Sequence, residues 1–412
     1  MTIAAPSAPN ATDAASVWRR YATEVKAKLR TTAADRDRAG RNPVGEIAWL
    51  KGAELLGILI PQEYGGGGGS WSDVAAVVQL IAEADSSIAH VLLYHYFGGL
   101  AGTRGENGFV GPDRARRIAE NQLLHGTIAQ AAYRPLILAT QTTEGFRLRG
   151  TKPFTSGAAL GDVLLAWVVF DEGTRLLGQD VSEQLATVHI ESGAAGLTFG
   201  DDWDNVGQRL TVSGSATLTD VPIATSDVIG YGYGVVESAP ADHLDVLYMF
   251  AGFASIFTGI AVGALEEAAQ YTRNCSRPWV ESGHQRAADD PLIQERFGEF
   301  WVQVQSAIAL TSRAVSAVDA VRAKGRALTW EERGDAVTLA NAARLNASEA
   351  ALSVSSRLFE VTGARSTAAG YGLDRFWRNA RTLSLHDPLH HKRVQIGDFV
   401  LNGTRPEPGF YS

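Results

Sequence analysis

The sequence predicts a mostly α-helical protein with a β domain in its middle. Apolar residues recur at helical spacing up to about residue 125, short β-type runs follow up to about residue 235, and long helical patterns return after that. We therefore predict a helical N-terminal domain over 1–125, a β-barrel-like domain over 126–235 and a C-terminal four-helix bundle over 236–412. A chain of 412 residues can bury both a core and a cofactor-sized cavity.

The N-terminal helices are predicted from two apolar faces separated by a glycine-rich turn. The two faces consist of Val17, Tyr21, Val25 and Leu29, and of Val74, Val77, Val78 and Ile81. Between them, the run Gly65 to Gly69 indicates a flexible loop, because glycine continues a helix only at a cost. No Gly-Lys-Ser/Thr follows, which disfavours a phosphate-binding loop, and Ser70 or Ser72 is expected to cap the next helix.

The middle and C-terminal domains are predicted from a change of pattern. The runs expected to form strands are Val163 to Phe170, Ala186 to Ile190 and Ala216 to Leu218. The later helical patterns are Ala254 to Arg273, Leu292 to Arg322, Trp330 to Gly363 and Leu373 to Arg381.

Composition excludes several classes of function. Val246 to Leu265 has no charged residue, but its glycines and hydroxyls and its acidic flanks favour a buried helix over a membrane span. The first 15 residues lack a secretory signal pattern, so we expect a cytoplasmic protein. The net charge of -8 argues against a nucleic-acid surface.

No metal site is predicted either. The single cysteine, Cys275, excludes an internal disulfide and a multi-cysteine cluster, and we expect it to be a small packed residue rather than a nucleophile. His390 and His391 are adjacent and would point in different directions on a helix.

Three motifs in this helix, β, helix order resemble the acyl-CoA dehydrogenase family over nearly the whole chain. They are Pro61-Gln62-Glu63-Tyr64-Gly65-Gly66, Gly150-Thr151-Lys152-Pro153-Phe154-Thr155-Ser156-Gly157, and the helix Arg375 to Arg381. In many members that helix leads to a catalytic glutamate, whereas here the loop reads His386-Asp387-Pro388. Further segments are similar to the dibenzothiophene monooxygenase branch: Asp201-Asp202-Trp203, Gly207-Gln208-Arg209, Ser213-Gly214-Ser215, Ser276-Arg277-Pro278-Trp279, and the run from Arg375 to Pro388.

The resemblance implies a two-component flavin monooxygenase acting on a heteroaromatic, sulfur- or indole-type substrate. In that branch a separate flavin reductase supplies reduced FMN or FAD, which forms a flavin C(4a)-hydroperoxide with dioxygen. The protein must then provide a dry pocket, hydrogen-bond donors and an acid. The family's bundles commonly assemble as homotetramers, so we expect flavin sites shared between subunits.

By this resemblance, His386 is the catalytic acid/base, because imidazole titrates near neutral pH. Ser156 is the second catalytic residue, because its hydroxyl can form a hydrogen bond to the flavin ring. A helix-end histidine and a turn serine are the structural alternatives. Phe154 and Thr155 are expected beside Ser156 at the flavin. Asp387 falls near the family's glutamate position, where a structural turn is the favoured role.

His95 and Tyr96, in an aromatic cluster, are expected in the substrate pocket, although a packed core histidine is nearly as good a reading. Arg277 and Arg365 resemble the arginines near the flavin phosphate, with surface ion pairs as the alternative.

Two departures from the branch put dibenzothiophene itself in doubt as the substrate. The dibenzothiophene enzyme has an asparagine followed by small polar residues in the stretch corresponding to Thr127 to Gln130, and it has a second histidine where this chain has Leu383. Two competing functions also stay open. An acyl-CoA dehydrogenase or oxidase would need a carboxylate base, for which Asp387 is the candidate, and a flavin-binding scaffold would have a degenerate site.

Overall fold

The computed structural model describes residues 13–97, 112–130, 134–231, 239–409 and 411–412. The N-terminal part is helical, as the sequence predicts, and Val17 and Val74 lie in its first and third helices. Ser70, one of the two expected caps, accepts a hydrogen bond from the Asp73 amide and begins the third helix with a capping box. The helices are α1 (Asp13–Ala39), α2 (Val44–Gly52), α3 (Trp71–Ala82), α4 (Ser86–Tyr94) and α5 (Pro112–Asn121).

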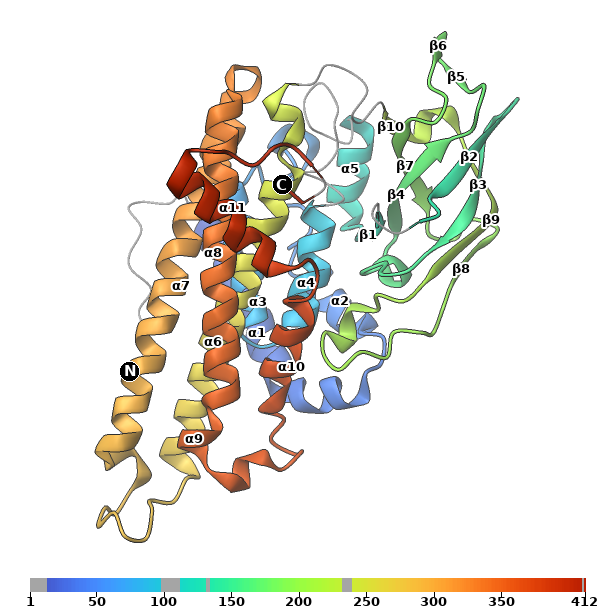
Figure 1. The fold of residues 1–412 in the computed structure, drawn as a ribbon. Helices are drawn as coiled ribbons and strands as arrows, with labels where there is room; N and C mark the ends of the chain where they lie inside the picture. The colour runs from blue at the N-terminus through green and yellow to red at the C-terminus, as the bar shows by residue number, and fades with distance from the viewer. Residues whose placement is uncertain (1–12, 98–111, 131–133, 232–238, 410) are drawn as a thin grey trace.

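The middle of the chain forms one mixed sheet at one side of the molecule (Figure 1). Its strands follow the order β10-β7-β4-β2-β3-β9-β8, and β1 and β2 both run parallel to β4. The path thus has β10 and β8 at its ends; β5 and β6 form a separate small pair. The strands are β1 (His125–Ile128), β2 (Ile137–Thr142), β3 (Gly145–Lys152), β4 (Val163–Phe170), β5 (Arg175–Leu176), β6 (Gln179–Asp180), β7 (Leu185–Glu191), β8 (Leu197–Phe199), β9 (Ala216–Ile223) and β10 (Val228–Tyr231).

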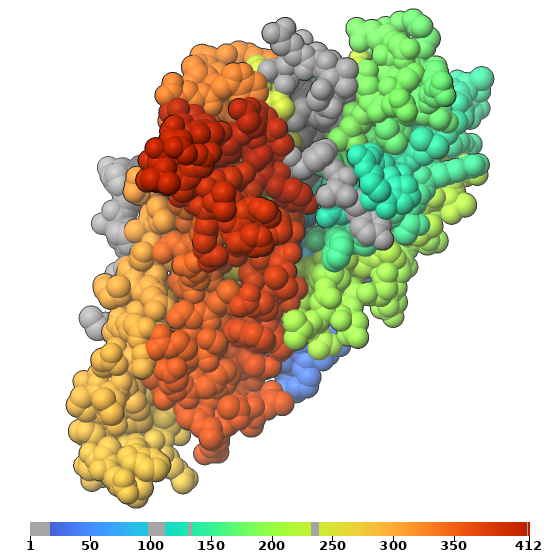
Figure 2. Space-filling model, viewed as in Figure 1, coloured from blue at the N-terminus to red at the C-terminus, as the bar shows by residue number. Residues whose placement is uncertain are grey.

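Long helices return after the sheet. Helices α6, α7 and α8 pack against one another, and α10 and α11 pack on α8. Figure 2 shows these C-terminal segments meeting the β domain along one face of the molecule. The helices are α6 (Asp245–Asn274), α7 (Pro291–Lys324), α8 (Trp330–Arg357), α9 (Phe359–Thr362), α10 (Asp374–Leu383) and α11 (Leu389–Asn402).

The helical parts at the two ends of the chain share one hydrophobic core, whereas the sheet has its own. α3 packs directly on α6, and glycines allow the close approach. A Cβ at Gly263 of α6 would overlap the carbonyl oxygen of Glu83, just after α3. The expected division at residue 125/126 falls at the start of β1, and the one at 235/236 lies outside the described residues.

The glycine run is ordered rather than the flexible loop that we expected. The amides of Gly67, Gly68 and Gly69 donate to carbonyl oxygens of residues 57, 60 and 58. A Cβ at Gly66 would overlap Ile60, so the run consists of glycine because it packs backbone against backbone.

The uncharged segment within α6 is buried inside the protein. Among the described residues, Pro240–Asn274 is the one helical stretch long and apolar enough to cross a membrane, and all of its most apolar window is covered by other parts of the chain. This agrees with the buried helix expected from its glycines and acidic flanks.

Candidate active site

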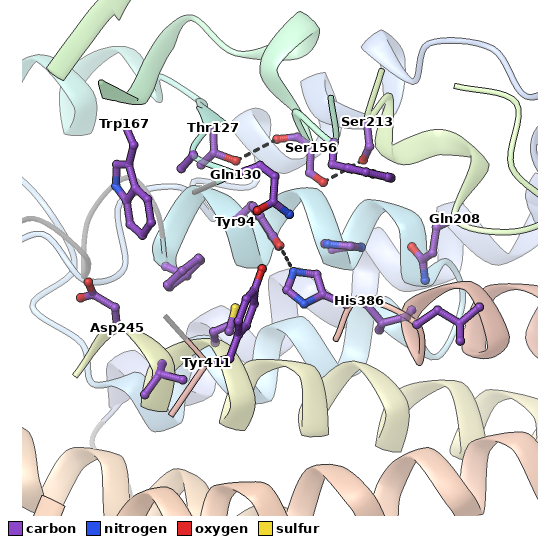
Figure 3. Close-up of a pocket in the computed structure, with 18 of the residues that line it drawn as sticks. Tyr94, Thr127, Gln130, Ser156, Trp167, Gln208, Ser213, Asp245, His386 and Tyr411 are labelled. Carbon is purple, nitrogen blue, oxygen red and sulfur yellow. Dashed lines mark hydrogen bonds between the residues drawn. The ribbon is translucent and has the colours of Figure 1, made fainter. Parts of the chain in front are cut away.

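A cavity of about 850 Å³ lies between the sheet and the helices. It lies against α4 and the start of α6 on the helical side and against β1, β4 and the loops beside β3 and β9 on the other. The turn after α10 and the last residues of the chain complete its wall (Figure 3). The residues that line the cavity include His90, Tyr94, Phe97, Thr127, Gln130, Phe154, Ser156, Trp203, Gln208, Ser213, Arg381, Leu383, His386 and Tyr411.

One face of α4 and of the turn that continues it reaches the cavity. His90, Tyr94 and Phe97 line it, at the i, i+4, i+7 spacing of a single helical face. His95 and Tyr96, which we expected in the substrate pocket, point the other way and are fully buried. The helical period therefore assigns Tyr94 to the cavity in place of its two neighbours, and this spacing is the signal that sequence reasoning missed.

His95 is held in the core by hydrogen bonds to the backbone. Its Nε2 lies 2.8 Å from the carbonyl oxygen of Leu56, and its Nδ1 accepts from the amide of His125 at 3.0 Å. The hydroxyl of Tyr96 donates to the carbonyl oxygen of Leu55. Both side chains thus join α4 to the segment after α2 and to β1, which is a structural role.

The burial of His95 leads to a prediction about acid stability. Burial lowers the pKa of His95 to about 4, below the usual value, so folding disfavours its protonated form. The free energy of unfolding is therefore highest above pH 6.5, where His95 is neutral in both the folded and the unfolded chain. It falls by about 3 kcal/mol as the pH falls to 4 and below. His95→Gln keeps one donor and one acceptor without a charge, and its urea midpoint should fall less steeply between pH 7 and 4 than that of the wild type. Equal slopes in the two proteins would contradict this assignment.

His386 lies in the turn between α10 and α11 and faces the cavity from the helical side. Its Nε2 is 3.0 Å from the hydroxyl of Tyr94, the bond drawn in Figure 3, and its Nδ1 is 3.1 Å from Oδ1 of Asp387. The ring of Phe253 meets it edge to face at 4.9 Å. His386 therefore has a fixed orientation, and the hydroxyl of Tyr94 connects its Nε2 to the cavity by a hydrogen bond.

Asp387 faces away from the cavity and is engaged by a buried arginine. Arg344 of α8 donates to both of its carboxylate oxygens, at 2.5 and 3.0 Å. Burial raises the pKa of the Asp387 carboxyl, but hydrogen bonds and charges from His386 and Arg344 outweigh this and hold the pKa well below its usual range. A carboxylate so strongly stabilised is a poor base for an α-proton, and it is not among the lining residues.

Ser156 and Phe154 lie on the opposite wall, in the segment after β3. The hydroxyl of Ser156 is 2.8 Å from that of Ser213 (Figure 3). The hydroxyl of Ser213 lies 2.7 Å from that of Thr211. Phe154 meets Trp203 edge to face at 6.3 Å and keeps 56% of its surface exposed. An uncovered aromatic ring beside paired hydroxyls suits a flat, polar-edged ring such as a flavin.

Two other loop residues position this wall. Thr155, expected at the flavin, is buried behind the wall and donates to the carbonyl oxygen of Gly214 at 2.8 Å. Gln208 lines the cavity, and its backbone N–H donates to Oδ1 of Asn379 in α10 at 2.6 Å. The segments that resemble the monooxygenase branch thus join the sheet to α10 at the cavity.

Arg277 and Arg365 are exposed and lie outside this cavity. They follow α6 and α9, and Ser276 ties the two segments together by donating to the carbonyl oxygen of Thr362 at 3.1 Å. The cavity touches the first turns of α6, whereas Arg277 follows its last. A helix of 30 residues is about 45 Å long, so these arginines and the cavity lie at opposite ends of α6.

Within the described residues, no group of three histidine, cysteine or acidic side chains is arranged to hold a metal ion. His390 and His391, both on α11, stack on each other at 4.5 Å, and Cys275 is exposed rather than packed as we expected.

Comparison with known proteins finds one family over both helical parts. Residues 13–101 match the model "Acyl-CoA dehydrogenase, N-terminal domain", and residues 251–390 match "Acyl-CoA dehydrogenase, C-terminal domain".

Individual relatives are similar over nearly their whole length. The chain is 39% identical to the probable FMNH2-dependent monooxygenase SfnC of Pseudomonas putida, covering 95% of this chain and 96% of SfnC. It is 37% identical to a dibenzothiophene monooxygenase of Rhodococcus erythropolis, covering 93% of each chain. A solved complex of TdsC from Paenibacillus sp. A11-2 with FMN and indole superposes with a TM-score of 0.88 at 32% identity, covering 96% of this chain and 99% of TdsC.

Proposed function

The chain belongs to the acyl-CoA dehydrogenase family, in the branch of the dibenzothiophene monooxygenases, and from this premise we propose that it is a monooxygenase that uses reduced FMN and dioxygen. Its substrate is a sulfur-containing or indole-type compound. One observation carries the proposal: His386 and Tyr94 face the cavity, whereas the nearby carboxylate, Asp387, is bound by Arg344 away from it.

The cavity fits a reduced flavin with a small substrate beside it. Its volume of about 850 Å³ is in the range of cofactor and ligand sites. Phe154 offers an uncovered ring face, and the hydroxyls of Ser156 and Ser213 offer both donors and acceptors for a flavin edge. When bound, reduced flavin supplies the electrons that activate dioxygen.

The residues of the chain then bind, exclude water and move a proton. Tyr94 and Phe97 form an apolar wall beside Tyr411, which limits the access of water to the reacting atoms. The hydroxyl of Tyr94, bonded to Nε2 of His386, is the group that holds or releases a proton at the cavity surface. On the opposite wall, Ser156 binds the flavin ring.

FMN is the cofactor that we propose, with FAD as the second choice. The relative SfnC is described as dependent on FMNH2, and TdsC forms a complex with FMN. We propose a two-component system, in which a separate flavin reductase supplies the reduced cofactor to a cytoplasmic oxygenase.

The substrate is a small aromatic or organosulfur compound other than dibenzothiophene. The departures from the dibenzothiophene enzyme lie in the stretch Thr127 to Gln130 and at Leu383. Of these residues, Thr127, Ala129, Gln130 and Leu383 line the cavity. A change of lining residues changes which substrate the pocket favours.

We also propose a homotetramer in which Arg277 and Arg365 reach the flavin phosphate of a neighbouring subunit. Both are exposed and remote from the cavity of their own chain. The same end and the outer helices expose large apolar side chains that assembly would cover: Trp279, Val280, Leu292, Trp301, Val302, Val400 and Leu401.

Turnover under two conditions tests the function. With chemically reduced FMN and dioxygen, the protein should convert indole or a small organosulfur compound to an oxygenated product. An acyl-CoA dehydrogenase would instead show bleaching of bound oxidised FAD by acyl-CoA thioesters without dioxygen. That result would replace the proposal, and flavin binding without either reaction would indicate a scaffold.

A further inference from the structure

Asp387 and Arg344 lie directly behind His386, on the side away from the cavity. Oδ1 of Asp387 is 3.1 Å from Nδ1 of His386 and also receives one of the two hydrogen bonds from Arg344. Asp387 is 5% exposed and Arg344 is fully buried. A bidentate arginine–carboxylate pair out of contact with water is held in one geometry.

Aromatic rings fix the arginine in turn. The guanidinium of Arg344 lies 4.8 Å from the ring centre of Phe250 and 5.3 Å from that of Phe253, both on α6. Phe253 also meets the ring of His386. The orientation of His386 is therefore set jointly by α6, α8 and its own turn.

We propose that Asp387 and Arg344 are positioning residues that fix the tautomer of His386, and through it the direction in which Tyr94 can give its proton. A carboxylate only accepts hydrogen bonds, so Nδ1 of His386 carries the hydrogen. In the neutral ring Nε2 is then an acceptor, and the hydroxyl of Tyr94 donates to it at 3.0 Å. While this bond persists, the Tyr94 proton points away from the cavity.

Protonation of His386 reverses that bond. Nε2 then carries a hydrogen and donates to the oxygen of Tyr94, which leaves the Tyr94 proton free to point into the cavity. When Tyr94 gives this proton to an acceptor there, it regains one from Nε2, and His386 returns to the neutral form with its hydrogen on Nδ1. Asp387 stays ionised throughout, because Arg344 stabilises its charge.

Other titratable groups also face His386. They are His90 and Tyr94 from α4 and Tyr411 from the last residues of the chain, while Lys392 of α11 interacts with Asp387 behind the ring. Burial lowers the pKa of His90 to about 3, with the charge of His386 as a lesser cause, so His90 stays neutral near neutral pH. The group in contact with Nδ1 of His386 is instead the negatively charged carboxylate of Asp387.

The alternative is that the pair only ties α8 to the turn after α10, and a set of variants separates the two roles. Asp387→Asn leaves the charge of Arg344 without its carboxylate, and Arg344→Met leaves Asp387 with only its hydrogen bond to His386, so each should lower Tm by roughly 5 °C or more. The double variant removes both charges and should regain most of that Tm. If the pair positions His386, oxygenated product per flavin oxidised should stay about tenfold or more below wild type in Asp387→Asn and in the double variant. A double variant that recovers product together with Tm would overturn the proposal.

A matched control uses a largely buried ion pair elsewhere. Arg375 of α10 is 4% exposed and pairs with Glu267 of α6. Arg375→Met with Glu267→Gln should change Tm without changing the yield of product per flavin. A similar loss of yield in this control would overturn the proposal, because any buried pair would then have the same effect.

Turnover of these variants rests on the proposed function, so the second readout uses neither flavin nor substrate. Neutron diffraction of the wild type at about pH 8 should show hydrogen on Nδ1 of His386 and none on Nε2, because Asp387 accepts at Nδ1 and Tyr94 donates to Nε2. Hydrogen on Nε2 with a bare Nδ1 would overturn the proposal even if the protein proves to be a monooxygenase. If the expected tautomer is found but reduced FMN gives no product, the proposed function fails and the positioning role stands.

Discussion

Replacing His386 by phenylalanine or alanine is expected to lower the rate of oxygenated product formation by roughly 10²- to 10⁴-fold, the loss typical of a missing general acid. The variant removes the only hydrogen-bond partner seen for the hydroxyl of Tyr94 among the described residues. It also removes the source of the proton that would replace the one given up by Tyr94. Flavin binding should survive, because the wall around Phe154 and Ser156 is intact. More of the reducing equivalents should therefore appear as hydrogen peroxide.

Single-turnover experiments with reduced FMN, in which product and hydrogen peroxide are both measured, check this expectation. His391→Phe is the control, since this neighbouring histidine is exposed on α11 and does not line the cavity. A His386 variant with the rate and peroxide yield of wild type would show that His386 is structural. The acid would then have to be sought among Ser156, Tyr94 and bound water.

The second large effect concerns flavin affinity. Replacing both Arg277 and Arg365 by alanine should weaken FMN binding by tenfold or more for each residue, because each would remove a charge-assisted hydrogen bond to a phosphate, worth about 1.5–3 kcal/mol. Fluorescence titration with FMN measures the change, and sedimentation shows whether the variant still assembles. Arg149→Ala, which removes an exposed arginine paired with Asp220 on the sheet, is the control.

Two outcomes would contradict the shared site. A double variant that assembles and binds FMN as tightly as wild type would show that the arginines serve another purpose. A wild-type monomer that binds FMN normally would show that assembly is not needed for the flavin site.

The sequence was most informative where function depends on a local motif. The helix Arg375 to Arg381 and its closing histidine sufficed to place His386 at the end of α10, and the segment after β3 sufficed to place Phe154 and Ser156 on the facing wall. These residues follow regular elements directly, so the ends of those elements determine where their side chains lie. The comparisons confirm the family and the monooxygenase branch that the same motifs indicate.

Contacts between distant segments could not be predicted in the same way. Arg344 lies in α8, 43 residues before Asp387, and no local pattern connects them. Arg344 is one of several polar residues of α8 that are buried, and nothing in the sequence of this helix distinguishes it as the partner of a carboxylate. Tyr94 was within reach of sequence reasoning, because its spacing from His90 and Phe97 is helical, but the aromatic cluster directed attention to its neighbours.

Incorporation of labelled oxygen tests the central claim most directly. The protein, chemically reduced FMN and ¹⁸O₂ are mixed without a reductase, and the product of an indole or organosulfur probe is examined by mass spectrometry. A monooxygenase should transfer one labelled atom to the product, and His386→Phe should abolish most of that transfer. Unlabelled products across the whole panel, with all dioxygen recovered as hydrogen peroxide, would contradict the account.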